Sequence, residues 1–133
     1  MKELNEIVGS VGYDELINGA FPPADVFGVT IRKGEAEVTL KRGTVLALAS
    51  GGDDPGKMVV LGTEKTGEET LTANCVLADD VTVGTEEDAT AVAYRTGHFN
   101  RNKLVVADEY TIKAEDEEEL RKGGILLDDA IEA

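Results

Sequence analysis

The 133-residue chain has little cysteine and few aromatic residues: one Cys, no Trp, three Tyr and three Phe. A single cysteine excludes an internal disulfide and any zinc site built from cysteines. Cys75 lies in the apolar run LTANCVLADD, which predicts a reduced thiol in the core. Because aromatic residues make up only 5% of the chain, we expect one modest core built mainly from Val, Leu, Ile and Ala.

Long apolar runs are also missing. No segment approaches the roughly 18 apolar residues that a membrane span needs. The opening MKELNEIVGS lacks the uninterrupted apolar region of a signal peptide and contains acidic residues. We therefore expect no membrane partner and a protein that stays in a reducing compartment.

Basic residues are scarce, with 13 Lys and Arg against 27 Asp and Glu, a net charge of −14. Such a chain repels polyanions and has no basic stacking surface, so we expect no nucleic-acid partner. The charge is uneven: residues 1–50 carry five basic and seven acidic side chains, whereas residues 51–133 carry eight and twenty. The nearly neutral first part suits a docking surface, and the acidic remainder suits a surface that faces solvent.

The only histidine, His98, lies in AVAYRTGHFNRNKLVV (residues 91–106). One histidine cannot form a paired zinc site, and the chain has neither a Gly-x-Ser-x-Gly motif nor an accessible Cys to serve as nucleophile. Gly97 and the run Asn100-Arg101-Asn102 favour a corner in a β-sheet, since Asn tolerates positive φ. The sequence predicts a structural or contact role for His98, no catalytic residue and no enzyme.

The acidic pairs and glycine-rich turns give no binding motif. The pairs at 53–54, 79–80 and 128–129 and the run 86–88 lack the spacing of an EF-hand loop. GGDDPGK lacks the ending of a P-loop and places acids where phosphates would bind. We expect no cofactor and no metal. One alternative stays open: a small β-barrel ligand- or metal-binding domain, or an enzyme, that uses carboxylates from the 79–88 and 108–119 regions.

Hydrophobic periodicity predicts a mainly β (α+β) fold, a small β-clip or barrel-like domain with one short C-terminal helix. The helix is expected at 115–124, with acids in its first turn, basic residues in its last, and Gly123 as left-handed C-cap. Lys33-Gly34 is expected to join two strands as a hairpin, and the loop 63–70 is expected to be mobile. The expected strands are 26–32, 35–40, 44–50, 57–62, 73–81 and 88–96, with the apolar tail from residue 125 as a possible last strand.

The first twenty residues differ from the rest. Leu4, Ile7 and Val8 have helical spacing, which Gly9 and Gly12 interrupt, and YDELINGAF adds a second apolar cluster before Pro22-Pro23. This pattern fits either a frayed terminus or a flexible N-terminal arm that orders against a partner. We divide the chain into an arm (1–20) and a β domain (21–133).

Five segments, in this order, carry a resemblance: YDELINGAFPP, LKRGTVLALAS, NCVLADDV, ATAVAYRTGHFNRNKL and ELRKGGILL. Together they resemble the bacteriophage head decoration proteins of the lambda type, over residues 13–127. Each motif alone is weak, but their common order is fairly specific. The acidic loops at 53–54 and 63–70 and the acidic tail depart from the family pattern.

The resemblance implies a β-clip-like fold and a non-enzymatic homotrimer on the outer capsid surface of the virion. Such a protein is synthesised in the host cytoplasm, binds the major capsid protein of the expanded head, and braces the shell against the pressure of packaged DNA. Trimerisation would combine three weak arms into one avid attachment. We expect capsid contacts from Leu4, Ile7, Val8, Tyr13, Leu16 and Ile17. Weaker candidates for subunit or capsid packing are Tyr94, His98 and Phe99.

Overall fold

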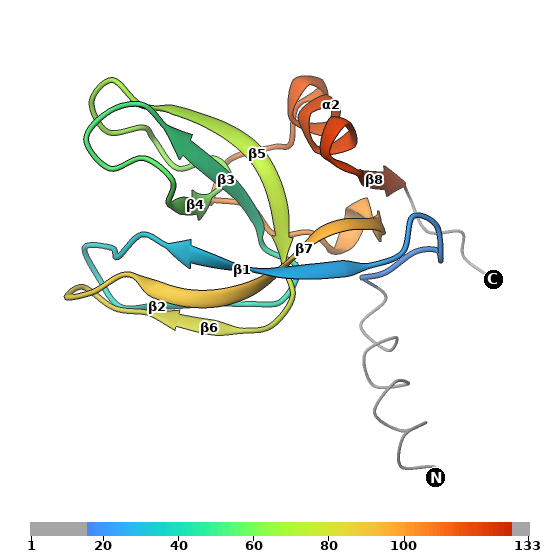
Figure 1. The fold of residues 1–133 in the computed structure, drawn as a ribbon, viewed down its shortest axis with the longest axis horizontal. Helices are drawn as coiled ribbons and strands as arrows, with labels where there is room; N and C mark the ends of the chain where they lie inside the picture. Colours follow the sequence, from blue (N-terminus) through green and yellow to red (C-terminus); the bar gives the residue numbers. More distant parts are fainter. Residues whose placement is uncertain (1–15, 129–133) are drawn as a thin grey trace, which may run out of the picture.

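The computed structural model describes residues 16–128, and predictions for residues 1–15 and 129–133 lie outside this range. The described chain is mainly β, which confirms the expected small barrel-like domain with one short helix (Figure 1). Its elements are β1 (Asp25–Ile31), β2 (Val38–Leu40), β3 (Val45–Ser50), β4 (Met58–Val60), β5 (Thr70–Leu77), β6 (Val81–Val83), β7 (Ala89–Asn100), the 3-10 helix η1 (Arg101–Lys103), α2 (Ala114–Gly123) and β8 (Ile125–Asp128). No helix in this range is long and apolar enough to cross a membrane.

Five strands close into a barrel. They follow the order β1, β4, β3, β5 and β7, and β7 pairs with β1 to close it. The pairings are antiparallel except that of β1 with β4, which is parallel and joins Ile31 to Met58. β8 extends the sheet in parallel beyond β7, while β2 and β6 form a separate two-stranded ribbon. Figure 1 shows this ribbon along one side of the barrel and α2 on the opposite side.

Small and branched aliphatic side chains fill the core, as the composition predicts. Cys75 is fully buried among them, in agreement with the expected core thiol. The other residues with no exposed surface include Val45, Leu46, Ala47, Val76, Leu77, Ala93, Phe99 and Leu120.

The predicted hairpin across Lys33-Gly34 is wrong. β1 pairs with β7 and β4, whereas β2 pairs with β6. The Lys33-Gly34 turn is bonded to the loop that follows β6, since Gly34 donates its N–H to the carbonyl of Gly84 at 3.0 Å. The alternating pattern locates both strands, but it contains no information about which strand lies alongside. It also predicts a buried face that β2 does not have, since Val38 is 47% exposed and Leu40 is only partly buried.

The predicted helix is confirmed with a shift of one residue. It spans Ala114–Gly123, and Gly124, not Gly123, adopts the left-handed C-cap conformation with φ 107°. The missing N-cap signal is replaced by Asp116, whose carboxylate accepts the Lys113 N–H at 3.0 Å. The helix packs on β5 and β8 through its buried Leu120, so that it holds the last strand against the barrel.

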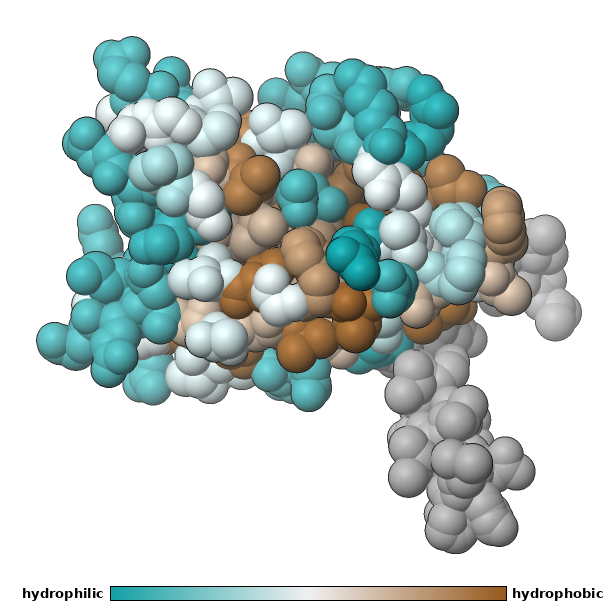
Figure 2. Space-filling model, viewed as in Figure 1, coloured by the Kyte–Doolittle hydropathy of each residue, from teal (hydrophilic) through white to brown (hydrophobic). Residues whose placement is uncertain are grey.

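Loops rich in acidic residues gather at one end of the barrel, on the left of Figure 1. These four loops are residues 32–37, 51–57, 61–69 and 84–88. They contain ten acidic and four basic residues, a net charge of −6. Figure 2 shows hydrophilic residues over this end and over α2, with hydrophobic residues across the middle of the same face.

Candidate functional site

The first described residues lie as a short extended segment beside the C-terminal half of β7. Asn18 donates its N–H to the carbonyl of His98, and Asn100 donates to the carbonyl of Leu16, both at 2.7 Å. Ile17 lies opposite Phe99 in an antiparallel bridge. Segment 16–18 therefore packs on β7, and we propose that the arm predicted at 1–20 ends before Leu16.

Of the six predicted capsid-contact residues, the structure describes only Leu16 and Ile17. Leu16 is 2% exposed and belongs to the core, so its side chain could reach a partner only by leaving the domain. Ile17 is partly buried against the same core. The other four candidates (Leu4, Ile7, Val8 and Tyr13) lie outside the described residues.

His98 lies within β7 rather than at a corner. β7 continues through Gly97 to Asn100, and the predicted turn follows as η1. The imidazole is 23% exposed, and its Nε2 lies 3.7 Å from a carboxylate oxygen of Asp128. A Cβ added at Gly19 would come within 2.7 Å of the imidazole. The ring thus lies between Gly19 and the end of β8 at Asp128.

Tyr94 and Phe99 pack inside the domain. Phe99 has no exposed surface, Tyr94 is 8% exposed, and their ring centroids are 5.3 Å apart. The Tyr94 hydroxyl accepts a hydrogen bond from Arg42 at 2.5 Å, and the Arg42 guanidinium lies 5.5 Å from the centre of the ring. The expected subunit or capsid packing by these two rings therefore has almost no exposed surface to support it, and their observed contacts are internal.

Groups suited to chemistry are sparse in the described residues. Burial raises the pKa of the Cys75 thiol to about 12, so the thiol is neither accessible nor ionised at neutral pH. No group of three or more His, Cys, Asp or Glu side chains in residues 16–128 is placed to hold a metal ion. The alternative metal site from regions 79–88 and 108–119 thus has no supporting group of ligands among the described residues.

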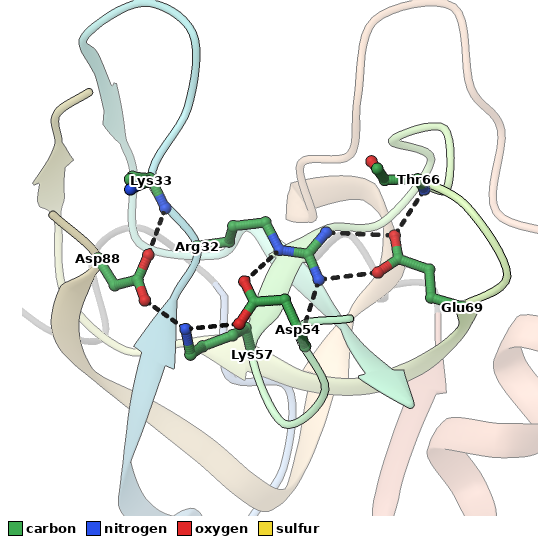
Figure 3. A network of polar contacts seen from close by, with 7 residues as sticks. All are labelled: Arg32, Lys33, Asp54, Lys57, Thr66, Glu69 and Asp88. Atoms are coloured by element: carbon green, nitrogen blue, oxygen red, sulfur yellow. Dashed lines mark hydrogen bonds and ion pairs between the residues drawn. The ribbon is translucent and has the colours of Figure 1, made fainter. Parts of the chain in front are cut away.

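A network of ion pairs ties the acidic loops together (Figure 3). Arg32, at the end of β1, donates to both carboxylate oxygens of Glu69, at 2.8 and 3.2 Å. It also donates to the main-chain carbonyl of Asp54 at 3.0 Å, and its Nε lies 3.3 Å from the Asp54 carboxylate. Glu69 is 2% exposed and also accepts the Thr66 N–H at 2.7 Å. Arg32 therefore links the loops that precede β4 and β5 to the end of β1.

Lys57 extends the network to the start of β7. Its ammonium contacts the carboxylates of Asp54, at 2.9 Å, and Asp88. Asp88 also accepts the Lys33 N–H at 2.9 Å. All four acidic loops are therefore joined by side chains. We call this network of Arg32, Asp54, Lys57, Glu69 and Asp88 the ionic clasp.

The clasp lowers the pKa of two carboxyl groups. The hydrogen bonds from Arg32, and then from Thr66, hold the pKa of Glu69 below its ordinary 4.5. The Lys57 ammonium, and then the Lys33 N–H, hold the pKa of Asp88 below its ordinary 3.8. A carboxyl with a lowered folded-state pKa stabilises the fold above its unfolded pKa, and this stabilisation is lost as the pH falls through the folded value.

We expect Glu69→Gln to lower the melting temperature at pH 7, because the Arg32 charge would lose its bidentate partner. The wild-type and variant melting temperatures should begin to converge below pH 4.5, the ordinary pKa of Glu69. They should become equal only once the pH has fallen through the lower folded-state pKa, where the wild-type carboxyl is also neutral. Circular dichroism melts from pH 7 to pH 3 measure this difference. Glu68→Gln, at an exposed neighbouring acid, is the matched control and should melt like wild type. Equal melting of the Glu69 variant and wild type at every pH would contradict a stabilising clasp.

Sequence reasoning missed the clasp because its members are far apart in the chain. Arg32 and Glu69 are separated by 37 positions, and Glu69 falls in the loop expected to be mobile. The adjacent bases Arg32 and Lys33, followed by the acids Glu35 and Glu37, were the available local signal. They mark a charged turn but do not identify the acids that pair with it.

Comparison with known proteins gives one family. A family model described as Bacteriophage lambda head decoration protein D matches residues 13–125, which is most of the chain. No curated protein matches the sequence. The matched range includes segment 16–18, β7 and α2 and ends at the first residue of β8.

Proposed function

Because the chain belongs to the bacteriophage lambda head decoration protein D family, we propose that it binds as a homotrimer to the expanded phage head and stabilises the shell against the pressure of packaged DNA. A head decoration protein is a structural component of the capsid surface rather than an enzyme, and this chain is placed there by its family. The partner that we propose is the major capsid protein.

The observation that carries the proposed mode of attachment is the fixed position of segment 16–18 on β7. Two main-chain hydrogen bonds of 2.7 Å and the buried Leu16 side chain fix this segment. Any pull on the preceding residues is thus transmitted directly to the barrel. We assign the capsid contact to Leu4, Ile7, Val8 and Tyr13, which precede this anchor in the sequence. Strand addition would supply the main-chain hydrogen bonds of the contact, and alternate side chains would supply its specificity.

The charge of the body supports the same proposal. A net charge of −14 keeps separate particles from associating, while the four acidic loops are held together by the ionic clasp. A stable, strongly acidic body suits a protein that coats the outside of a large particle.

The test is binding to purified expanded shells, with unexpanded precursor shells of the same phage as the control. We expect the protein to co-sediment with expanded shells in multiples of three copies, and decorated shells to withstand higher temperatures than bare ones. Light scattering of the free protein gives its mass independently. Equal binding to both kinds of shell, or decorated shells that break as easily as bare ones, would contradict the proposed stabilising role.

A further inference from the structure

An uncharged strip lies on the outer face of the paired strands β1 and β7. Val29, Ile31 and Ala91 point into the barrel, and the residues between them point outward. The outward residues that are exposed are Val26, Gly28 and Thr30 on β1 and Thr90 and Val92 on β7, and none carries a charge. Figure 2 shows hydrophobic residues gathered where β1 and β7 cross in Figure 1. A strip of this kind is unusual on a chain with a net charge of −14.

Gly28 leaves a position without a side chain in the middle of this strip, and we call this open position the notch. A Cβ at this position would meet nothing within 4 Å, and the φ of Gly28 is not positive. The fold therefore does not require glycine there, and a glycine inside a strand weakens it. Gly97 differs, because a Cβ there would lie 2.7 Å from the Phe99 ring. The space above Gly28, opposite Val92 in register, is open toward an approaching group.

A protruding aromatic residue lies on the same chain, just before β1. Phe21 is 78% exposed, and it is the most exposed large hydrophobic residue in the described range. Its loop is braced against β7, since the Thr96 hydroxyl donates to the Pro23 carbonyl at 2.7 Å. Aromatic residues, Phe among them, are enriched in the buried centres of protein interfaces, so an aromatic side chain this exposed is a candidate anchor that would enter a pocket on its partner.

We propose that this strip is the contact between copies of the chain, with Phe21 of one copy seated in the notch at Gly28 of the next; this inference rests on the proposed homotrimer. Two strongly acidic copies repel each other wherever their charged surfaces meet. The strip is neutral, and the nearby Asp25 is neutralised by Arg95 at 3.0 Å. Because the anchor and the notch occupy different places on one chain, the contact is head-to-tail. Such a contact closes into a ring of three when each copy is rotated by a third of a turn, which is the geometry that the proposed homotrimer requires.

The experiment compares wild type with Gly28→Gln, which fills the notch, and Phe21→Ser, which removes the anchor. Gly84→Gln is the matched control, because Gly84 also has open space at its Cβ position and no positive φ but lies outside the strip. Circular dichroism melts establish that each variant is folded. Light scattering over a concentration series should give three chains for wild type and Gly84→Gln. The two strip variants should associate roughly 30-fold more weakly, the effect of losing an interface hot spot.

The outcomes separate this inference from the proposed function. If wild type and all three variants are trimers of equal strength, the strip is not the contact between copies, although the homotrimer stands. If such trimeric strip variants lose binding to expanded shells, the strip contacts the capsid protein and the inference is again overturned. If wild type is a monomer in solution and also binds shells without cooperativity, both the strip contact and the proposed homotrimer are wrong.

Discussion

Deletion of residues 1–15 should abolish binding to expanded heads and leave a folded domain. The cut falls before Leu16, so the buried Leu16 side chain and the hydrogen bonds that join segment 16–18 to β7 are kept. We expect at least ~100-fold weaker binding, because the gain from linking three arms in one trimer is lost with the arms. Co-sedimentation of the truncated and full-length proteins with expanded shells measures the effect, and light scattering confirms that the oligomeric state is unchanged.

Two further variants give this deletion its controls. Replacing Leu4, Ile7, Val8 and Tyr13 with Ser in the full-length chain should reproduce the loss of binding if these side chains make the contact. Deletion through residue 20 should additionally lower the melting temperature, because it removes the buried Leu16 from the core. Undiminished binding by the protein that lacks residues 1–15 would contradict the assignment of the capsid contact to this segment.

The positions of most strands are predictable, but the position of β6 (Val81–Val83), which falls at the end of the strand expected at 73–81, and the neighbours of the strands are not. The period-two pattern located β1, β3 and most of β7, because alternation follows directly from one face being buried. The closure of the barrel by β1 and β7 joins Ile31 to Ala89 across 58 positions of the chain. Local pattern carries no information about such a contact, so it favours the nearer but wrong partner, the segment at 35–40. Chain proximity therefore predicts pairing poorly in a closed barrel.

The candidate site shows the same division between local and distant information. The apolar cluster around Leu16 and Ile17 was identified, but its spacing cannot distinguish a side chain that fills the core from one that binds a partner. The deciding interactions are main-chain hydrogen bonds to His98 and Asn100, about 80 positions later in the sequence. Gly97 and Phe99 lie two positions apart in the segment ATAVAYRTGHFNRNKL, but the sequence does not show that a Cβ at Gly97 would lie 2.7 Å from the Phe99 ring.

Phe99→Ala should cause a large loss of stability. The ring has no exposed surface, packs on Tyr94, and lies opposite Ile17 at the anchor of segment 16–18. Removing it should lower the free energy of unfolding by about 3–5 kcal/mol, the usual cost for a Phe in a core. That is a large part of the roughly 5–15 kcal/mol by which a domain is stable. Urea denaturation measures the change, and Val105→Ala, at a 45% exposed side chain, should change it by under ~0.5 kcal/mol.

Gly97→Ala tests why the ring needs this glycine. A Cβ at Gly97 would lie 2.7 Å from two carbons of the Phe99 ring, in a backbone conformation with φ 151° that favours glycine. The variant should be destabilised, and adding Phe99→Ala should cost less than it does in wild type, because the clash disappears with the ring. Hydrogen exchange at the Asn18 N–H should accelerate in both single variants, since its acceptor His98 lies between these two residues. If the losses of unfolding free energy from the two changes add fully, and hydrogen exchange at the Asn18 N–H is unchanged, the Phe99 ring and segment 16–18 are independent. In that case segment 16–18 could detach from β7 without disturbing the core. If the two changes are instead coupled, a force on the residues before Leu16 acts on the core through Phe99.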